Sequence, residues 1–436
     1  MSGNEIRQGI REVWSGLQAA ERHELFSGLP HVDAEELYLE LSSQDQMELL
    51  EAMPVLARRS WLRLLAPDDA VDLIQWVAPE GQPEYLSLLD EPTRREVEAL
   101  MAYQEDQAGG LMSPRFARLR ADMTADQAVT YLRRQPLGAY ETIYTLYVLD
   151  AEQRLLGVVS LRDLLIAAPQ AVVAGFMVSQ PVSARPGLDQ EQLSRLFANH
   201  DLNSIPVVDE HGVMQGIVTI DDIVDVVQEE ATEDFQKIGG MEALDAPYLR
   251  VGFTTMLKAR AGWLTALFLG EMLTATAMGY FEAEIARAVV LALFVPLIIS
   301  SGGNSGSQAT TLVIRAMALG EVQLRDWWRV ARRELAAGLC LGLILGCVGL
   351  LRILLWQYLF GSYGPHFLRI GLAVSFSLVG VVMFGTLAGS TLPFVLRRLN
   401  CDPASASAPF VATLVDVTGL VIYFSMARLI LQGVLL

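Results

Sequence analysis

Residues 410–424 have the sequence FVATLVDVTGLVIYF, an apolar run that contains one acidic side chain, Asp416. The basic residue nearest to it is Arg428. Placing a charged side chain in a bilayer costs roughly 2.5–3.5 kcal/mol on insertion scales, so a carboxylate in such a run indicates function. Its most natural ligand is a cation.

Apolar segments long enough to span a bilayer fill the C-terminal part of the chain around this run. We predict five membrane spans, at residues 262–280, 288–312, 335–360, 367–396 and 409–435. Arginines gather in the second-to-third and fourth-to-fifth connections: Arg315, Arg325, Arg329, Arg332, Arg333, Arg397 and Arg398. By the positive-inside rule the N-terminal half is cytoplasmic and Leu436 lies outside. The absence of a signal sequence at the start of the chain favours the same orientation.

The charges divide the chain into two parts. Residues 1–250 hold 42 acidic and 19 basic residues, and residues 251–436 hold 8 acidic and 13 basic residues, within a whole-chain net charge of −18. We therefore expect an acidic, water-soluble half followed by a membrane domain. Such acidity argues against nucleic acid as a partner. It favours divalent cations that screen the carboxylates, although a solvated surface explains any one acidic run.

A second polar cluster lies in the second span, where residues 300–308 have the sequence SSGGNSGSQ around Asn304. Close helix packing through small residues is one explanation, and a polar pore lining is the other. Thr413 lies three residues before Asp416, on the same helical face, so the pair offers a hydroxyl and a carboxylate to a hydrated ion. Mg²⁺ prefers such oxygen ligands and retains its waters. Glu271 in the first span is either a second residue of the ion path or an interhelical hydrogen-bonding group.

The soluble half contains an internal repeat between residues 114 and 227. Each copy has a strand, a glycine turn, a second strand and then a hydroxyl residue three positions before an aspartate, Ser160 with Asp163 and Thr219 with Asp222. The pattern is similar to a tandem cystathionine-β-synthase (CBS) pair, in which the aspartate can accept from a ribose hydroxyl. Simple helix capping is an equally good explanation of these residues.

Acidic residues also gather on either side of this repeat. The preceding region, broken by prolines at 54, 67, 79 and 92, predicts short helices stacked as a solenoid, and Asp68, Asp69 and Asp72 occur together near a helix start. After the repeat, acidic residues recur at helical spacing between Asp222 and Asp234, where like charges repel.

Five motifs together resemble the bacterial MgtE magnesium channels: GGNSGSQ (302–308), DPA (402–404), PFVATLVDVTG (409–419), EDQAGGLMSP (105–114) and EATED (230–234). The resemblance implies a multidomain homodimer in the bacterial cytoplasmic membrane. Its parts would be an all-α superhelical N domain (1–110), α/β tandem CBS domains (111–228), a connecting helix (229–258) and an α-helical membrane domain with five transmembrane helices (259–436).

The resemblance also implies roles for particular residues. Asp416 would hold hydrated Mg²⁺ in the pore, with support from Asn304 and Thr413. Regulatory Mg²⁺ would bind Asp68, Asp69, Asp189, Asp201, Asp222, Asp225, Glu230, Glu233 and Asp234 and hold the channel shut. Ser160, Arg162 and Asp163 match nucleotide contacts, with ATP as a modulator, but Thr145 and Leu202 stand where aromatic stacking partners are expected.

Three rival functions follow from the same residues. A less selective transporter of Mn²⁺, Co²⁺ or Ni²⁺ is disfavoured because no His, Cys or Met lies beside Asp416. A non-conducting membrane-anchored metal sensor would explain the acidic half but not Asn304 and Asp416. An enzyme is the least favoured, since the soluble half has no nucleophile–base pair, P-loop or zinc motif.

Overall fold

The computed structural model describes residues 9, 10, 13, 14, 16–136, 140–244, 246 and 248–433. The chain divides into two compact units, Met1–Glu230 and Ala231–Leu436, which we describe separately. Leu436, whose side of the membrane was predicted above, lies outside the described residues.

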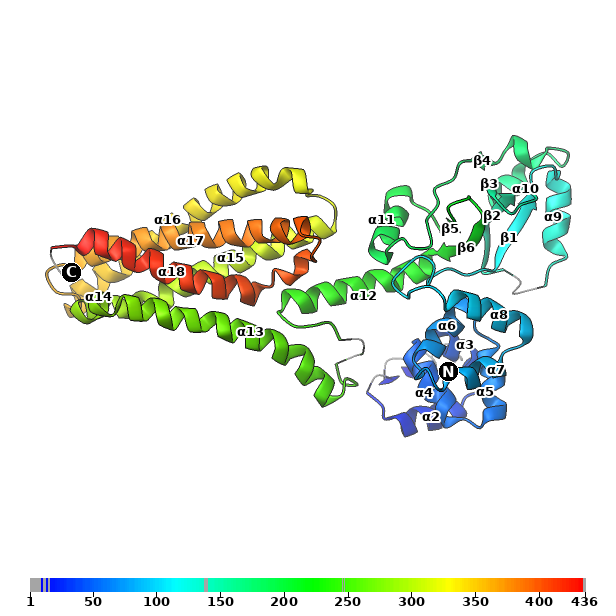
Figure 1. Cartoon of the computed structure of the whole chain (residues 1–436), viewed down its shortest axis with the longest axis horizontal. Helices are drawn as coiled ribbons and strands as arrows, with labels where there is room; N and C mark the ends of the chain where they lie inside the picture. Colours follow the sequence, from blue (N-terminus) through cyan, green and yellow to red (C-terminus); the bar gives the residue numbers. More distant parts are fainter. Residues whose placement is uncertain are drawn as a thin grey trace. The chain divides into compact units, whose positions relative to one another are not determined.

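The first unit begins with short helices (Figure 1). They are α2 (Ala19–Ser27), α3 (His31–Glu40), α4 (Ser43–Ala52), α5 (Val55–Leu62), α6 (Pro67–Gln75), α7 (Gln82–Leu88) and α8 (Glu91–Leu100). Prolines stand where helices begin: Pro54 precedes α5, and Pro67 and Pro92 lie in first turns. A proline is tolerated there because the first amides of a helix have no intrahelical partner. The all-helical prediction for this region is confirmed.

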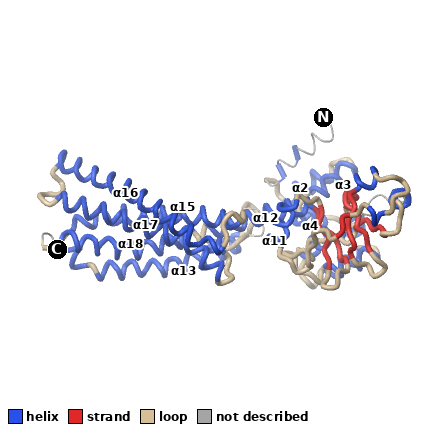
Figure 2. Tube along the Cα trace, turned by 90° about the horizontal axis from the view of Figure 1, so that it is seen from above, coloured by secondary structure: helices blue, strands red, loops and turns tan. Residues whose placement is uncertain are grey.

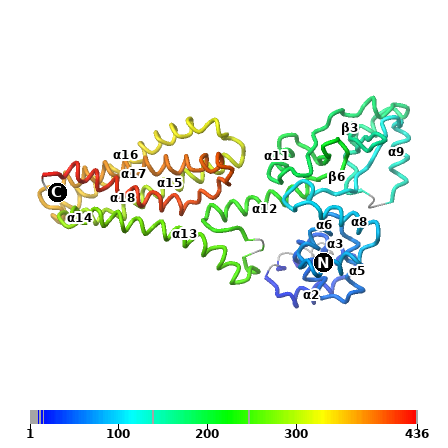
Figure 3. The backbone as a smooth tube through the Cα atoms, in the orientation of Figure 1, coloured from blue at the N-terminus to red at the C-terminus, as the bar shows by residue number. Residues whose placement is uncertain are grey.

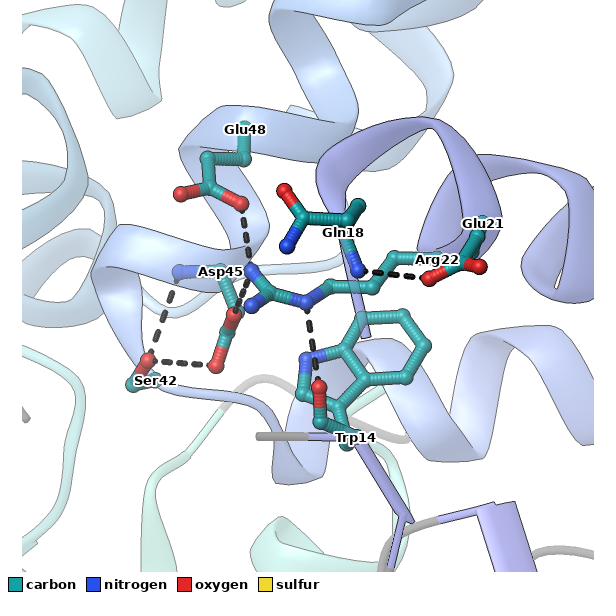
Figure 4. Close-up of polar contacts among 7 residues, drawn as sticks. All are labelled: Trp14, Gln18, Glu21, Arg22, Ser42, Asp45 and Glu48. Carbon is teal, nitrogen blue, oxygen red and sulfur yellow. Dashed lines mark hydrogen bonds and ion pairs between the residues drawn. The ribbon is translucent and has the colours of Figure 1, made fainter. Parts of the chain in front are cut away.

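A buried arginine links α2 to α4 in this helical region (Figure 4). Nη1 of Arg22 lies 3.3 Å from Oδ1 of Asp45 and 2.6 Å from Oε2 of Glu48. Its Nε donates to the carbonyl of Trp14 over 3.1 Å, and the guanidinium lies 5.9 Å from the centre of the Trp14 ring. Removing one partner from a buried ion pair typically costs about 3–5 kcal/mol, so this contact holds the two helices in register.

The predicted repeat forms two small sheets, which hold all the strands in the part of the chain that the structure describes (Figure 2). One sheet has the order β1–β2–β3–β4, and its strands are β1 (Phe116–Arg120), β2 (Thr142–Leu149), β3 (Leu155–Ser160) and β4 (Val178–Ser179). Strand β1 is parallel to β2, and the pairs β2–β3 and β3–β4 are antiparallel. The other is the antiparallel pair β5 (Ser204–Val208) and β6 (Met214–Thr219). Helices α9 (Ala125–Arg133), α10 (Leu161–Ile166) and α11 (Gln190–His200) accompany the strands, with the 3₁₀ turn η1 (Val173–Gly175). The α/β repeat is confirmed.

The two copies of the repeat share buried polar and apolar contacts. The hydroxyl of Tyr147 on β2 lies 2.7 Å from Oγ of Ser204 on β5, and both side chains are buried. Tyr147 also packs with Phe116, Met214 and Ile217. A satisfied hydroxyl at the centre of this apolar cluster fixes how one copy lies against the other.

Helix α12 (Ile220–Ile238) leaves β6 and crosses the boundary between the two units. In the second unit the chain then forms a bundle of long helices, green to red in Figure 3. These are α13 (Phe253–Tyr280), α15 (Val295–Ala318), α16 (Trp327–Phe360), α17 (Phe367–Arg398) and α18 (Ala408–Leu431). The short elements α14 (Glu282–Arg287), η2 (Val289–Phe294), η3 (Leu324–Asp326) and η4 (Pro403–Ser405) connect them.

Five helical segments among the described residues are long and apolar enough to cross a membrane, which confirms the five-span prediction. Glycines allow α15 and α17 to touch: a Cβ on Gly385 would lie 2.3 Å from the carbonyl oxygen of Gly302, and one on Gly389 would lie 2.2 Å from that of Gly306. Part of the 300–308 motif therefore serves close helix packing, the first of the two explanations given above.

Candidate functional site

The start of helix α18 fixes the position of Asp416 in the second unit. Ser407 caps this helix, because its hydroxyl accepts from the amide of Phe410 over 3.3 Å, and Pro409 occupies the first turn. The indole Nε1 of Trp263 on α13 donates to the same hydroxyl over 3.1 Å. Asp416 follows two turns later and is half-buried, so its carboxylate lies inside an apolar helix bundle and is still accessible.

Two neighbours shape the space around this carboxylate. Gly303 on α15 lies beside it, since a Cβ at that position would make an ordinary contact, at 4.0 Å, with Oδ1 of Asp416. The carboxyl group of Glu271 on α13 lies within hydrogen-bonding reach of Asp416. Two carboxylates at such a distance repel each other unless a proton or a cation lies between them. The arrangement therefore suits a positively charged ligand.

Thr413 lies beside a hollow of about 530 Å³ that is otherwise lined by α13: Leu264, Thr265, Leu267, Phe268 and Glu271. Its hydroxyl donates to the carbonyl of Pro409 over 3.1 Å, which leaves the lone pairs of the oxygen free to accept. Glu271 thus faces both the hollow and Asp416. A hydrated ion could be held there by carboxylates and a hydroxyl.

Asn304 occupies a different face of α15 from the packing glycines. Its side chain is exposed, and Nδ2 donates to Oγ of Ser300 over 3.4 Å. Within the described part of the chain no hydrogen bond joins it to Asp416. The role of Asn304 in an ion path stays a prediction.

Acidic residues that are far apart in the sequence meet in the first unit, between α6 and α12. Burial, followed by the charges of Asp69, Glu105, Asp222 and Glu229, raises the pKa of Asp72 to about 7. Burial also raises the pKa of Asp222 to about 7; the charges of Asp221 and Asp69 add to this, and hydrogen bonds from Thr219 oppose it. These shifts show that the carboxylates lie close enough together for their charges to interact.

Asp68 is the most deeply placed member of this group. It is 7% exposed, and its Oδ1 has no hydrogen-bond partner among the described residues. Burial, followed by the charges of Glu141, Asp69 and Asp222, raises its pKa well above the usual range. An unpartnered, buried carboxylate oxygen is costly, so this position favours a bound cation or a proton.

No group of three or more His, Cys, Asp or Glu side chains in the described part of the chain has the geometry to ligate one metal ion directly. This is compatible with Mg²⁺, which keeps several waters and uses one or two carboxylates. The acidic cluster of α6 and α12 therefore suits a hydrated ion.

The remaining predicted regulatory residues have other local partners, except Asp225. Asp189 caps α11 by accepting from the amides of Glu191 and Gln192, and Asp201 ends that helix in a left-handed conformation. Glu230 accepts from Gln190 over 2.7 Å. Glu233 forms a salt bridge with Lys237, and Asp234 lies on the same helix. Asp225 contributes to the charge that acts on Asp69.

The predicted nucleotide residues show the geometry of a helix cap. Oγ of Ser160 accepts from the amide of Asp163 over 3.0 Å and donates to its Oδ2 over 2.7 Å. Thr145 pairs with Ser160 across β2 and β3, and Arg162 is exposed. The capping alternative therefore has direct support, and nucleotide binding stays a prediction.

Three residues of these clusters were absent from the predicted site. Glu141, just before β2, lies near Asp68. The sequence pattern could not predict this, because the two residues are far apart in the chain. Asp72 was visible as part of the acidic run with Asp68 and Asp69, of which helix capping explains one residue and not all three. Glu271 was visible as an acid inside a span, but its partner could not be derived from spacing.

Comparisons with known proteins cover all parts of this architecture. The chain matches the family models described as the MgtE intracellular N domain (residues 8–106), the CBS domain (108–169 and 173–229) and a divalent cation transporter (295–426). It is 43% identical over 431 residues to the magnesium transporter MgtE of Thermus thermophilus, covering 98% of this chain and 93% of that protein. The chain belongs to the MgtE family.

Two further MgtE proteins match nearly all of this chain and half of it, respectively. The magnesium transporter MgtE of Bacillus subtilis is 30% identical over 415 residues, 95% of this chain and 90% of the relative. The crystal structure of the cytosolic domain of the Mg²⁺ channel MgtE in complex with ATP is 41% identical, covers 50% of this chain and 90% of its own, and gives a TM-score of 0.47.

Proposed function

We propose that this MgtE chain conducts Mg²⁺ across the bacterial cytoplasmic membrane through a path that passes Asp416. The observation that carries this proposal is the half-buried Asp416 carboxylate within hydrogen-bonding reach of Glu271, inside a unit of five apolar helices. The absence of His, Cys and Met next to Asp416 in sequence favours a hard, oxygen-preferring ion over Co²⁺ or Ni²⁺.

The proposed path has oxygen ligands only. Asp416 supplies the charge, Thr413 a hydroxyl and Asn304 an amide group, and the contact with Asp416 adds Glu271 to this set. Mg²⁺ would pass with most of its waters in place, because it dehydrates reluctantly. The protein would act as a homodimer, with its N-terminal half in the cytoplasm and its C-terminus outside.

A second part of the proposal concerns gating. Cytosolic Mg²⁺ would bind the acidic cluster of α6 and α12 and hold the channel shut, and the unpartnered Oδ1 of Asp68 supports a cation at that position. An ion that binds only the closed state stabilises it in proportion to the logarithm of its concentration. When cytosolic Mg²⁺ falls, repulsion between the carboxylates would separate the helices.

Growth of a bacterial strain deficient in Mg²⁺ uptake tests the transport proposal. The wild-type chain should restore growth at low Mg²⁺, and Asp416→Ala should not, at equal amounts in the membrane. Thr418→Val on the same helix is a matched control, because Thr418 does not line the hollow that Thr413 and Glu271 share. Rescue by Asp416→Ala equal to that by wild type would refute the proposed path.

A further inference from the structure

A basic hollow lies where the chain enters its third candidate span. Arg325, Asp326, Trp328, Arg329 and Arg332 line a hollow of about 300 Å³ at the start of α16. Arg329 and Arg332 are three residues apart on α16 and share one helical face, and Arg325 lies in the 3₁₀ turn η3 just before this helix. This cluster has no part in the ion path described above.

The charges of the hollow are only partly compensated. Nη1 of Arg329 lies 3.0 Å from Oδ1 of Asp326, whose other oxygen accepts from the amide of Gln323 over 3.2 Å. Arg325 and Arg332 are exposed and form no salt bridge within the residues that the structure describes. Two guanidinium groups therefore remain available for an anion, and guanidinium forks match phosphate oxygens well.

The position of the hollow identifies the kind of anion. The candidate membrane span runs from Leu324 to Phe360, so the arginines lie at the level where lipid headgroups meet the apolar core. Trp327 and Trp328 are 52% and 63% exposed, with ring centres 5.4 Å apart. Tryptophan prefers this interfacial layer, where its ring meets acyl chains and its N–H meets water.

We propose that this hollow binds the headgroup phosphate of an anionic phospholipid. Arg325 and Arg332 would contact the phosphate, Asp326 would keep Arg329 oriented beside it, and the Trp327 and Trp328 rings would pack against the glycerol and upper acyl chain. The positive-inside rule accounts for arginines in this connection. It does not account for their gathering around one hollow beside two exposed tryptophans.

The test measures lipid retained by the purified full-length protein in native mass spectrometry. The probes are palmitoyl-oleoyl phosphatidylglycerol, phosphatidylcholine with the same chains, and glycerol phosphate. Wild type should prefer phosphatidylglycerol, and Arg325→Gln with Arg332→Gln should reduce that preference by about five-fold for each arginine. Arg397→Gln with Arg398→Gln is the matched control for general surface charge and should have little effect.

Two further measurements test the proposal even if the Arg325 and Arg332 double variant does not fold. Raising the salt concentration from 50 to 500 mM should reduce the phosphatidylglycerol preference of the wild type, because exposed charges are screened. Trp327→Leu with Trp328→Leu should weaken lipid retention without changing charge. Equal binding of both lipids, an equal loss in the Arg397 and Arg398 control, or displacement of the lipid by glycerol phosphate at equal concentration would each overturn the proposal.

Discussion

The ammonium nitrogen of Lys237 lies 2.6 Å from Oδ2 of Asp402, so the end of α12 is bonded to the loop that precedes α18. Glu233, one turn earlier on α12, lies 2.5 Å from the same nitrogen. Oδ1 of Asp402 accepts from the amide of Ala404 over 2.8 Å and shapes the turn. Partial burial opposes the charge of Lys237, but the two carboxylates raise its pKa to about 12, so it is charged at physiological pH.

Lys237→Met should therefore weaken the link between α12 and the Asp416 helix. The pair is partly exposed, so its contribution is about 1 kcal/mol, and closure by cytosolic Mg²⁺ should need roughly five-fold more ion. Patch recordings at graded cytosolic Mg²⁺ measure this shift. Lys258→Met, on α13, is the control. Unchanged closure in Lys237→Met would show that this salt bridge does not take part in gating.

Glu271→Gln tests the second carboxylate beside Asp416. If Glu271 helps to hold the ion, loss of its charge should lower Mg²⁺ uptake by about ten-fold, equivalent to roughly 1.4 kcal/mol. Glutamine keeps the hydrogen-bonding capacity and volume, so a purely interhelical bond would survive the change. Uptake is measured with a Mg²⁺-sensitive dye in proteoliposomes, with the exposed Glu282→Gln as control. Wild-type flux would remove Glu271 from the ion path.

The sequence predicted the five spans because length and apolarity are local properties, but it misplaced some helix ends. The first span was expected from residue 262 and the third from 335, whereas α13 begins at Phe253 and α16 at Trp327. Polar residues such as Lys258 and Arg332 concealed these ends. Helices continue into the headgroup layer, where charged side chains remain hydrated, so hydropathy marks only the buried part of a span.

Contacts between residues that are far apart in the chain could not be predicted from the sequence pattern. The repeat predicted Ser160 with Asp163 and Thr219 with Asp222, because capping acts over three residues. The approach of Glu141 to Asp68 and of Glu271 to Asp416 depends on how whole helices and strands pack. Likewise, the 300–308 motif indicated either packing or a pore, and only the glycine contacts with α17 show how much of it serves packing.

Millimolar Mg²⁺ should protect residues 70–240 from limited proteolysis, and EDTA should expose them, if the ion links the acidic surfaces. Neutralising five carboxylates together should weaken this protection and leave the channel open at high cytosolic Mg²⁺; these are Asp222, Asp225, Glu230, Glu233 and Asp234. Arg22 and its partners, which lie outside this cluster, supply an internal reference for cleavage. Identical protease patterns with Mg²⁺ and with EDTA, together with normal closure of the variant that carries all five substitutions, would show that these carboxylates form only a solvated surface.

The acidic cluster should also respond to pH when no divalent ion is present. Because the pKa of Asp72 and that of Asp222 are both raised to about 7, their stabilising protonated forms are fully present near pH 4 and lost as the pH rises through 7. Amide hydrogen exchange in α6 and α12 of the full chain, corrected for intrinsic rates, should accelerate from pH 5.5 to 8. Asp72→Asn should flatten this profile, and the exposed Asp122→Asn should not. Corrected exchange that is independent of pH in wild type would contradict these shifts.

Mg²⁺ flux through Asp416→Asn shows whether the charge of Asp416 is needed to carry Mg²⁺ through the membrane unit. The comparison uses proteoliposomes with an enclosed Mg²⁺ indicator, equal amounts of folded protein and Thr418→Val as control. Asparagine preserves volume and hydrogen bonding, so we expect flux near that of empty liposomes for Asp416→Asn and near wild type for the control. Wild-type flux through Asp416→Asn would show that Mg²⁺ passes without this charge.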